Sequence, residues 1–191
     1  MNQLVKLDKQ IFFNFYHLTG QNYWRDKVFD FLAQQLIYLV PVILVVLWFW
    51  SKEAKNVALK AVTAGLLAWF GFSNLIGYFY YRARPFVTNQ NVKELLFHRP
   101  DRSFPSDHSA FLFALAFCFL FLGYRKLGLA MILISLLVSA SRIIVGVHYP
   151  ADIAAGLAIG LFSAVIIWFL QKPLDKIYNP LITFAKKLRL A

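Results

Sequence analysis

Cysteine is nearly absent from this chain of 191 residues, and that absence excludes two kinds of protein. The one cysteine, Cys118, lies in the middle of an apolar stretch. No disulfide can form within the chain, and we expect Cys118 to be a small buried hydrophobic residue. The four histidines and the cysteine show no spacing typical of zinc ligands. The sequence therefore predicts neither a disulfide framework nor a zinc centre.

Acidic residues are also scarce, with 9 Asp and Glu against 20 Lys and Arg, which gives a net charge of +11. An excess of positive charge can indicate a nucleic-acid partner. Here the basic residues fall between apolar runs and in the C-terminal tail, and they form no single basic face. This distribution is the positive-inside bias of membrane proteins, so no nucleic-acid partner is expected.

Long polar segments are missing as well. Hydrophobic residues make up 60% of the chain and the mean hydropathy is +0.58, whereas soluble domains are about 45–50% apolar. A transmembrane helix needs roughly 20 apolar residues. Five runs reach that length, at about 31–50, 61–81, 106–124, 127–147 and 150–170. With no repeat and no sign of a second domain, the sequence predicts an all-α integral membrane bundle of about five transmembrane helices, forming one membrane-embedded domain over residues 1–191.

The N-terminal segment has a different pattern. Residues 3–18 carry apolar side chains at helical spacing among lysines and an aspartate, which predicts a helix lying in the membrane interface and ending near Gly20. The apolar cluster at 11–18 is interrupted by Asn14 and His17, and it lacks a basic start and a small-residue cleavage site. We therefore do not expect a signal peptide.

The lysines and arginines also predict the orientation. Basic residues separate the first and second runs and the third and fourth runs, and they follow the fifth run. These residues are Lys52, Lys55, Lys60, Arg125, Lys126, Lys172, Lys176, Lys186, Lys187 and Arg189. Their side is expected to be cytoplasmic, so that residues 82–105 and the turn near 148 face outward. The outward loop is itself rich in arginine, and an anionic substrate would explain that exception.

Three polar segments stand at the edges of the apolar runs. They are Arg82-Ala83-Arg84-Pro85, Pro105-Ser106-Asp107-His108, and Ser141-Arg142 followed by His148 and Asp152. Ionisable residues at membrane depth are costly and usually belong to a functional site. The lengths of the runs return all three segments to the same face of the membrane, so we expect them to meet.

The residue types in these segments suit phosphoryl transfer. Asp152, in the first turn after Pro150, lies four residues from His148 and could fix the tautomer of its imidazole, leaving one nitrogen free as a nucleophile or base. Arg84 and Arg142 match phosphate oxygens and stay charged. Ser106 begins a helix whose backbone N–H groups can bind an anion, and His108 is a candidate general acid.

Each of these residues alone has a simpler structural interpretation. An arginine at the end of a span usually anchors the helix to headgroups. A lone histidine on an apolar face is usually a packing residue, and Ser106 is a common helix cap. Their joint occurrence at one face favours the functional interpretation.

The three segments together resemble the type-2 phosphatidic acid phosphatase superfamily of membrane lipid phosphatases. Its pattern is Lys-x6-Arg-Pro, then Pro-Ser-Gly-His, then Ser-Arg-x5-His-x3-Asp. The third motif is complete here, the second has Asp107 at the glycine position, and the first keeps Arg84-Pro85 with Gly77 at the lysine position. The resemblance covers about residues 77–152. Within the superfamily, the chain is most similar to the bacitracin-resistance type of undecaprenyl diphosphate phosphatase.

This resemblance implies a role for each matching residue. His148 would attack phosphorus and form a phosphohistidine, oriented by Asp152, and His108 would protonate the leaving group. Arg84, Ser106 and Arg142 would hold the phosphate oxygens. No metal and no cofactor are implied.

Two departures from the family pattern need an explanation. With Gly77 in place of the lysine, one phosphate cation is lost, and we expect Arg82 to supply it and to favour diphosphates over monophosphates. Asp107 places a negative charge among the phosphate-binding residues. We expect it to point away from the phosphate, to pair with an arginine or to cap the helix.

The expected function is hydrolysis of a lipid-linked phosphate at the outer face of the cell membrane. The preferred substrate is undecaprenyl diphosphate, giving undecaprenyl phosphate and inorganic phosphate. The alternatives are a phosphatidic acid or phosphatidylglycerophosphate phosphatase and, from another class, a non-catalytic lipid or anion transporter, although the sequence has no inverted repeat. The expected partners are the lipid phosphate and membrane lipids. Gly156 and Gly160 predict close helix packing, within the chain or with a second copy.

Overall fold

The computed structural model describes residues 3–188, and within that range helices are the only regular secondary structure, apart from an isolated bridge between Ala83 and Arg102. The helices follow one another along the chain as α1 (Gln3–Tyr16), α2 (Tyr23–Gln34), η1 (Leu36–Tyr38), α3 (Leu39–Trp50), α4 (Lys52–Leu66), η2 (Leu67–Ser73), α5 (Asn74–Phe79), α6 (Pro85–Thr88), α7 (Asp107–Phe121), α8 (Arg125–Ile144), α9 (Pro150–Phe169) and α10 (Gln171–Lys187). The predicted all-α class is confirmed.

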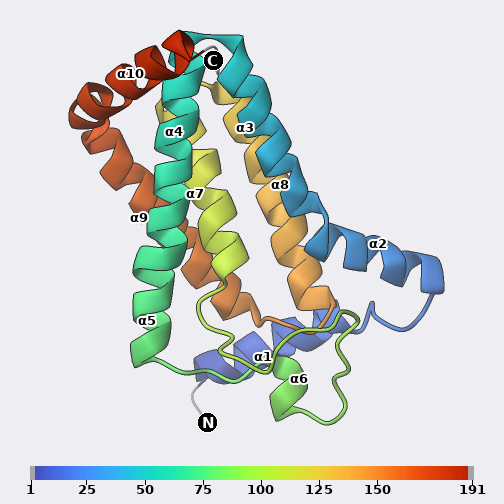
Figure 1. Cartoon of the computed structure of the whole chain (residues 1–191). Helices are drawn as coiled ribbons and strands as arrows, with labels where there is room; N and C mark the ends of the chain where they lie inside the picture. Colours follow the sequence, from blue (N-terminus) through green and yellow to red (C-terminus); the bar gives the residue numbers. More distant parts are fainter. Residues whose placement is uncertain (1–2, 189–191) are drawn as a thin grey trace.

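Helix α7 is the centre of the bundle, and α4, α8 and α9 pack around it (Figure 1). Its close approach to α9 depends on two glycines. A Cβ at Gly156 would lie 2.8 Å from the Ser106 carbonyl oxygen, and one at Gly160 would lie 2.8 Å from the Ala110 carbonyl oxygen. The Gly-x-x-x-Gly pair therefore packs against a helix of the same chain.

The structure does not have one membrane-spanning helix for each of the five predicted runs. Among the described residues, three helices are long and apolar enough to cross a membrane: Lys52–Phe79, Arg125–Ile144 and Pro150–Phe169. The pair α2 and η1–α3 would add a fourth if it counts as one span bent by 42°. Helix α7 has only 15 residues, or about 22 Å at 1.5 Å per residue, which is shorter than a hydrocarbon core of about 30 Å.

The predicted polar connection between the first two runs is wrong. Ser51 caps α4 by accepting a hydrogen bond from the Ala54 N–H, so the helix begins about nine residues earlier than expected and continues through η2 and α5. Lys60 is buried inside this helix, where its Nζ lies 2.7 Å from Oδ1 of Asp175 in α10. Helix α10 covers this end of the bundle, where only a basic tail was expected. Arg189, in the same tail, lies outside the described residues.

The opposite end of the bundle carries all three polar segments, as the sequence predicts. The ends of α5 and α8 and the starts of α7 and α9 meet there, and α1 and α6 lie across this end together with the connection from α6 to α7 (Figure 1). Helix α1 confirms the predicted N-terminal helix, ending at Tyr16 just before Gly20. This end of the molecule is where the candidate residues come together.

Candidate active site

Asp152, like Ser106, has no exposed surface. It lies in the first turn of α9 after Pro150, where its Oδ2 accepts hydrogen bonds from the Tyr149 N–H at 2.7 Å and from the Ser103 hydroxyl. Nδ1 of His148 lies 3.5 Å from the same oxygen and makes no shorter contact among the described residues. The predicted pairing of His148 with Asp152 is therefore present, at a distance that is long for a hydrogen bond.

The turn between α8 and α9 positions His148. Gly146 has a φ of +85°, which favours glycine, and it lets the chain reverse immediately after α8. The Arg142 carbonyl oxygen then accepts from the N–H groups of Val147 and His148, at 3.2 and 3.3 Å. The backbone of His148 is thus fixed to the last turn of α8, and Arg84 holds the same turn by donating from Nη1 to the Val147 carbonyl at 2.9 Å.

The imidazole of His148 lies between the carboxylate of Asp152 and the guanidinium of Arg84. Nδ1 faces Asp152, while Nε2 lies 3.3 Å from Nη1 of Arg84. Because a guanidinium can only donate, these partners assign the proton to Nδ1 and a lone pair to Nε2. Burial, reinforced by Arg142 and Arg84 and opposed by Asp152, lowers the pKa of His148 to about 3. The ring is therefore neutral at physiological pH, with Nε2 available as a nucleophile.

Arg84 and Arg142 are both buried, and each contacts the connection between α6 and α7. Nε and Nη2 of Arg84 lie 2.8 Å from Oδ1 of Asp101. Nη2 of Arg142 lies 3.1 Å from Nε2 of His98, and its Nη1 donates to the Ala33 carbonyl at 3.2 Å. Nε of Arg142 has no hydrogen-bond partner within residues 3–188. The two arginines form a buried cationic site beside His148.

Ser106 lies where three helices meet. Its side chain caps α7, accepting from the Ser109 N–H at 3.5 Å and the Ser109 hydroxyl at 3.2 Å. Its own N–H donates to the Asp152 carbonyl oxygen at 3.1 Å. The Ser109 and Ser139 hydroxyls lie 2.8 Å apart, which extends the chain of serines to α8. These contacts bring the start of α7 against the first turn of α9 and against α8.

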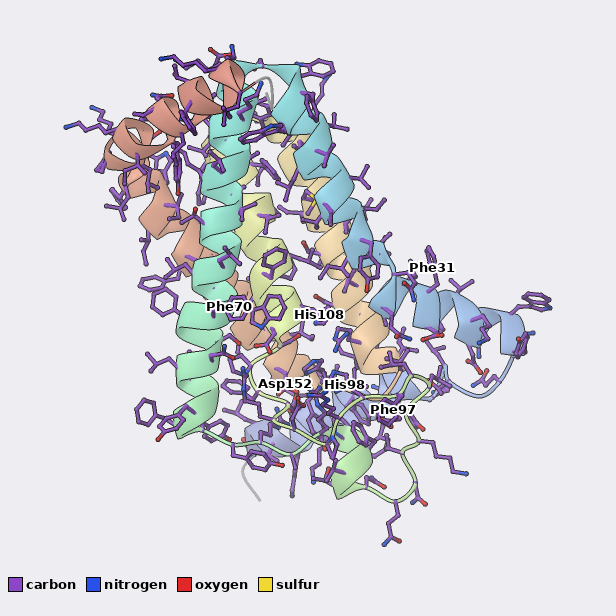
Figure 2. All side chains as sticks on the ribbon, in the orientation of Figure 1. Phe31, Phe70, Phe97, His98, His108 and Asp152 are labelled. Atoms are coloured by element: carbon purple, nitrogen blue, oxygen red, sulfur yellow. The ribbon has the colours of Figure 1, made fainter. Side chains whose placement is uncertain are left out.

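His108 follows in the first turn of α7 and belongs to the same cluster. Figure 2 shows His108, His98 and Asp152 near one another around the start of α7. Its ring interacts electrostatically with Arg142 and His148. The ring makes no hydrogen bond to other described residues, and it lines a narrow gap with Ile37, Trp69 and Phe111. A proton on this ring could therefore be given to a bound molecule instead of a protein acceptor.

The segment 98–103 supplies four contacts that sequence reasoning missed. His98 reaches Arg142, Asp101 reaches Arg84, Arg102 reaches Asp107, and Ser103 reaches Asp152. The Ser103 N–H donates to the Arg82 carbonyl at 2.7 Å, next to the bridge between Ala83 and Arg102. The one signal in the sequence was the density of polar side chains just before Pro105-Ser106-Asp107-His108.

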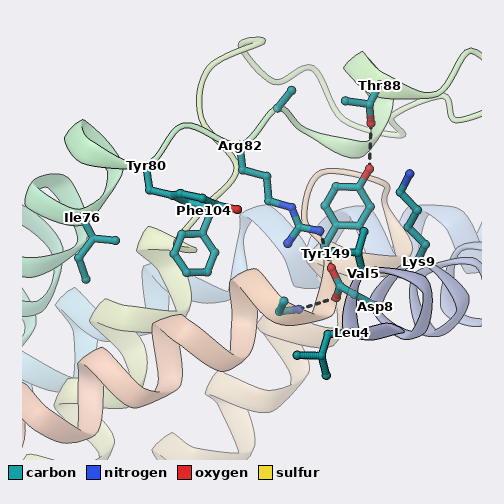
Figure 3. A pocket seen from close by; sticks show the side chains of 12 residues that line it. Leu4, Val5, Asp8, Lys9, Ile76, Tyr80, Arg82, Thr88, Phe104 and Tyr149 are labelled. Atoms are coloured by element: carbon teal, nitrogen blue, oxygen red, sulfur yellow. Dashed lines mark hydrogen bonds and ion pairs between the residues drawn. The ribbon is translucent and has the colours of Figure 1, made fainter. Parts of the chain in front are cut away.

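Arg82 does not have the position expected of a phosphate cation. Nη1 lies 2.8 Å from Oδ1 of Asp152, Nη2 is paired with Asp8 of α1, and the guanidinium stacks 4.0 Å from the centre of the Tyr149 ring. Figure 3 shows Arg82 beside Asp8 and Tyr149 at the edge of a pocket of about 680 Å³, whose lining includes apolar side chains from α1 and α5. With its two terminal nitrogens bound to carboxylates, Arg82 supports Asp152.

Asp107 also differs from the expectation that placed it among the phosphate-binding residues. Its Oδ1 lies 3.2 Å from Nη2 of Arg102 and accepts from the Ser73 hydroxyl at 2.5 Å. Asp107 therefore pairs with an arginine, as one of its predicted alternatives required. The predicted helix cap is wrong, because Ser106 fills that role.

Arg102 connects the two departures from the family pattern. A Cβ at Gly77 would lie 2.4 Å from Cδ and Nε of Arg102, so the arginine side chain fills the space above this glycine. The same guanidinium pairs with Asp107. A larger residue at position 77 would displace Arg102, and the side chain that takes this position is Arg102, not Arg82.

Comparisons with known proteins show which proteins this chain is similar to. The model of the PAP2 superfamily matches residues 56–175. Bacitracin transport permease protein BcrC from Bacillus licheniformis is 34% identical over 177 residues, covering 91% of this chain and 86% of that protein. Undecaprenyl-diphosphatase BcrC from Bacillus subtilis (strain 168) is 31% identical over 186 residues, covering 95% and 91%. The crystal structure of Aquifex aeolicus LpxE has a TM-score of 0.65 at 23% identity, covering 84% of this chain and 94% of that one, which supports the fold.

Proposed function

Because the chain belongs to the PAP2 superfamily, we propose that it is a membrane lipid phosphatase that works through a phosphohistidine on His148. The observation that carries this proposal is the imidazole of His148, which is buried between the carboxylate of Asp152 and the guanidinium of Arg84. Nε2 keeps its lone pair and faces a cation that would attract the phosphoryl group. Few structural roles would require a buried acid, histidine and arginine in this order.

In the first step, Nε2 of His148 attacks phosphorus and the bond from phosphorus to the leaving oxygen breaks. His108 gives its proton to that oxygen, which departs as an alcohol or, from a diphosphate, as a lipid phosphate. In the second step, water attacks the phosphohistidine, His108 accepts the proton of the water, and inorganic phosphate leaves. Asp152 stabilises the positive charge that develops on the imidazole in each step.

The phosphate oxygens would be held at the start of α7. Arg84 and Arg142 supply buried charge, and Ser106 supplies a hydroxyl beside the helix N-terminus. Arg102 is proposed as the further cation that we expected Arg82 to supply, because it fills the space above Gly77. These groups carry the charge stabilisation that metal ions carry in many phosphoryl-transfer sites. We therefore propose turnover without a metal or another cofactor.

Undecaprenyl diphosphate is the proposed substrate, with undecaprenyl phosphate and inorganic phosphate as products. The support is the relative from Bacillus subtilis that is named an undecaprenyl-diphosphatase and aligns over most of both chains. The pocket beside Arg82 is lined by Leu4, Val5, Ile76 and Phe104 and could take an apolar chain next to Asp152. The active site is proposed to face outward, because Lys52 and the lysines of α10 lie at the opposite end of the bundle.

A transporter remains the second candidate, because the relative from Bacillus licheniformis is named a transport permease. Transport alone gives His148 and Asp152 no chemical task. The two functions separate in detergent, where no second compartment exists and only an enzyme releases phosphate.

The test is phosphate release by the purified protein from undecaprenyl diphosphate, undecaprenyl phosphate, phosphatidic acid and phosphatidylglycerophosphate. We expect the highest kcat/KM for the diphosphate, and loss of several orders of magnitude in His148→Ala. A clear preference for either glycerophospholipid would replace the proposed substrate. Absence of phosphate release from all four lipids would reject the enzyme.

A further inference from the structure

The carboxylate of Asp101 forms an ion pair with Arg84. Oδ1 of Asp101 lies 2.8 Å from both Nε and Nη2 of this arginine. The side chain of Arg84 is only 6% exposed, whereas that of Asp101 is 56% exposed. An acidic group at the surface thus reaches inward to a buried cation.

This contact occupies the edge of Arg84 formed by Nε and Nη2. Its third nitrogen, Nη1, donates to the Val147 carbonyl and lies beside Nε2 of His148. A phosphate oxygen and a carboxylate oxygen both accept hydrogen bonds from the same planar pair of N–H groups on a guanidinium. A phosphate that binds through Nε and Nη2 must therefore displace Asp101.

The displacement requires little else to move. Arg102 and Ser103, which follow Asp101, are fixed to the chain at Ala83 and Arg82 by the bridge and the backbone hydrogen bond. His98 holds the other side of the segment against Arg142. Because Asp101 is half exposed, its carboxylate can rotate into water, and no buried charge is left unpaired.

From this arrangement we propose, resting on the proposed function, that Asp101 competes with substrate phosphate for Arg84 and so weakens substrate binding. The ion pair between Asp101 and Arg84 is lost whichever phosphate binds there, so its cost is the same for a lipid diphosphate and a lipid monophosphate. The protein therefore carries a competitor of its own substrate.

The test is Asp101→Asn, which keeps the shape of the side chain and removes its charge. We expect kcat/KM to rise about fivefold for undecaprenyl diphosphate and for undecaprenyl phosphate alike, which is the scale of a half-exposed ion pair. The ratio of the two values should stay near that of wild type. Asp30→Asn is the matched control, because it removes an equal charge from α2, outside the arginine cluster.

Two outcomes would overturn the proposal. Unchanged kcat/KM on both substrates would show that Asp101 does not compete with substrate. An equal loss on both substrates would show that it supports Arg84 and does not compete. A second measurement needs no turnover: inorganic phosphate, titrated calorimetrically, should bind Asp101→Asn about fivefold more tightly than wild type, and equal or weaker binding would contradict competition. Failure of the proposed function is recognised separately, when wild type releases no phosphate from any lipid.

Discussion

The side chains of this site are held by a series of hydrogen bonds and ion pairs that extends beyond the family motifs. His148 depends on Asp152, and Asp152 is held by Ser103, the Tyr149 N–H and Arg82. Arg82 in turn pairs with Asp8, which also accepts from the Ala151 N–H at 2.8 Å. The N-terminal helix therefore acts on the orientation of the imidazole without contacting it.

Arg82→Ala tests this series of contacts. Removing the guanidinium frees one oxygen of Asp152, so we expect kcat to fall at least about tenfold on lipid diphosphate and lipid monophosphate alike, or roughly 1.4 kcal/mol of transition-state stabilisation. KM should change less, because Arg82 touches no phosphate in this account. Steady-state kinetics on both substrates provides the measurement.

Arg99→Ala is the control for that variant, since Arg99 is exposed on the same end of the molecule. A loss in Arg82→Ala confined to the diphosphate would return Arg82 to the role predicted from the sequence, that of a substrate cation.

Two histidines of the site, the buried His148 and the partly exposed His98, predict how stability depends on pH. Burial lowers the pKa of His148 to about 3, and burial with the nearby charge of Arg84 lowers that of His98. The unfolded chain binds protons below about pH 6.5 while these folded groups do not, so the free energy of unfolding decreases as pH falls below that value. Each histidine contributes at most about 1.4 kcal/mol per pH unit, for His148 down to about pH 3.

We therefore expect unfolding in detergent at pH 7, 6 and 5 to show a shallower loss of stability for His148→Asn than for wild type. The comparison variant is His17→Asn, which removes an exposed imidazole. Parallel curves for wild type and His148→Asn would mean that the folded protein protonates this ring.

For single residues, the sequence predicted which side chains lie close together wherever a motif had fixed spacing. The pairing of His148 with Asp152 and the proximity of Arg84 and Arg142 followed from such spacing and from the lengths of the apolar runs. The contacts of His98, Asp101 and Ser103 could not be predicted, because an irregular connection has no periodicity to show where its side chains turn. Arg82 was misplaced for the same reason, since alternation along Arg-Ala-Arg does not show which carboxylate is near.

At the scale of whole helices, the bundle depends on glycines that let helices pack closely, as well as on apolar contacts. Along α9, Gly156 and Gly160 touch the backbone of α7, and Gly65 of α4 lies against Phe111 and Leu115 from its other side. The short, central α7 therefore depends on small residues of its neighbours, and its first turn carries Ser106 and His108.

Gly160→Ala tests that dependence. The added methyl group would lie 2.8 Å from the carbonyl oxygen of Ala110 and from the N–H nitrogen of Ala114, and neither backbone atom can rotate away. We expect a loss of about 1–3 kcal/mol in unfolding free energy, with reduced activity as the start of α7 shifts. Ala158→Val adds methyl groups at an exposed position of the same helix and should leave thermal stability near wild type. Equal melting temperatures for all three proteins would show that close packing at Gly160 does not stabilise the fold.

The elements themselves were predictable where long apolar runs define them, as in α8 and α9. The start of α4 was missed because three lysines marked it as a loop, although Lys60 is neutralised by Asp175 of a helix far along the chain. Burial raises the pKa of Asp175, but the hydrogen bonds from Lys60 and Asn56 outweigh it and hold that pKa below its usual range. Such a long-range pair leaves no local signal in a single sequence.

The molecule as a whole is polarised between a catalytic end and a lysine-rich end. The arginines of the site lie at the end crossed by α1, and Lys172, Lys176, Lys186 and Lys187 lie on α10 at the opposite end (Figure 1). This separation supports an outward-facing site, since lysines near span ends favour the cytoplasmic side.

Thiol labelling of intact cells tests the orientation. In a Cys118→Ala background, Gln90→Cys should react with a membrane-impermeant reagent and Lys187→Cys should react only after lysis, because both positions are exposed at opposite ends. Labelling of position 187 alone in intact cells would reverse the topology and place the substrate in the cytoplasmic leaflet.

We propose above that the phosphoryl group is transferred to His148. Undecaprenyl diphosphate labelled in its terminal phosphate, mixed with the protein and quenched rapidly without acid, should label wild type at His148 while leaving His148→Ala unlabelled. Asp101→Asn, which keeps the nucleophile, should still be labelled. Label on another residue, or substantial turnover by His148→Ala, would contradict the assignment of His148 as the nucleophile.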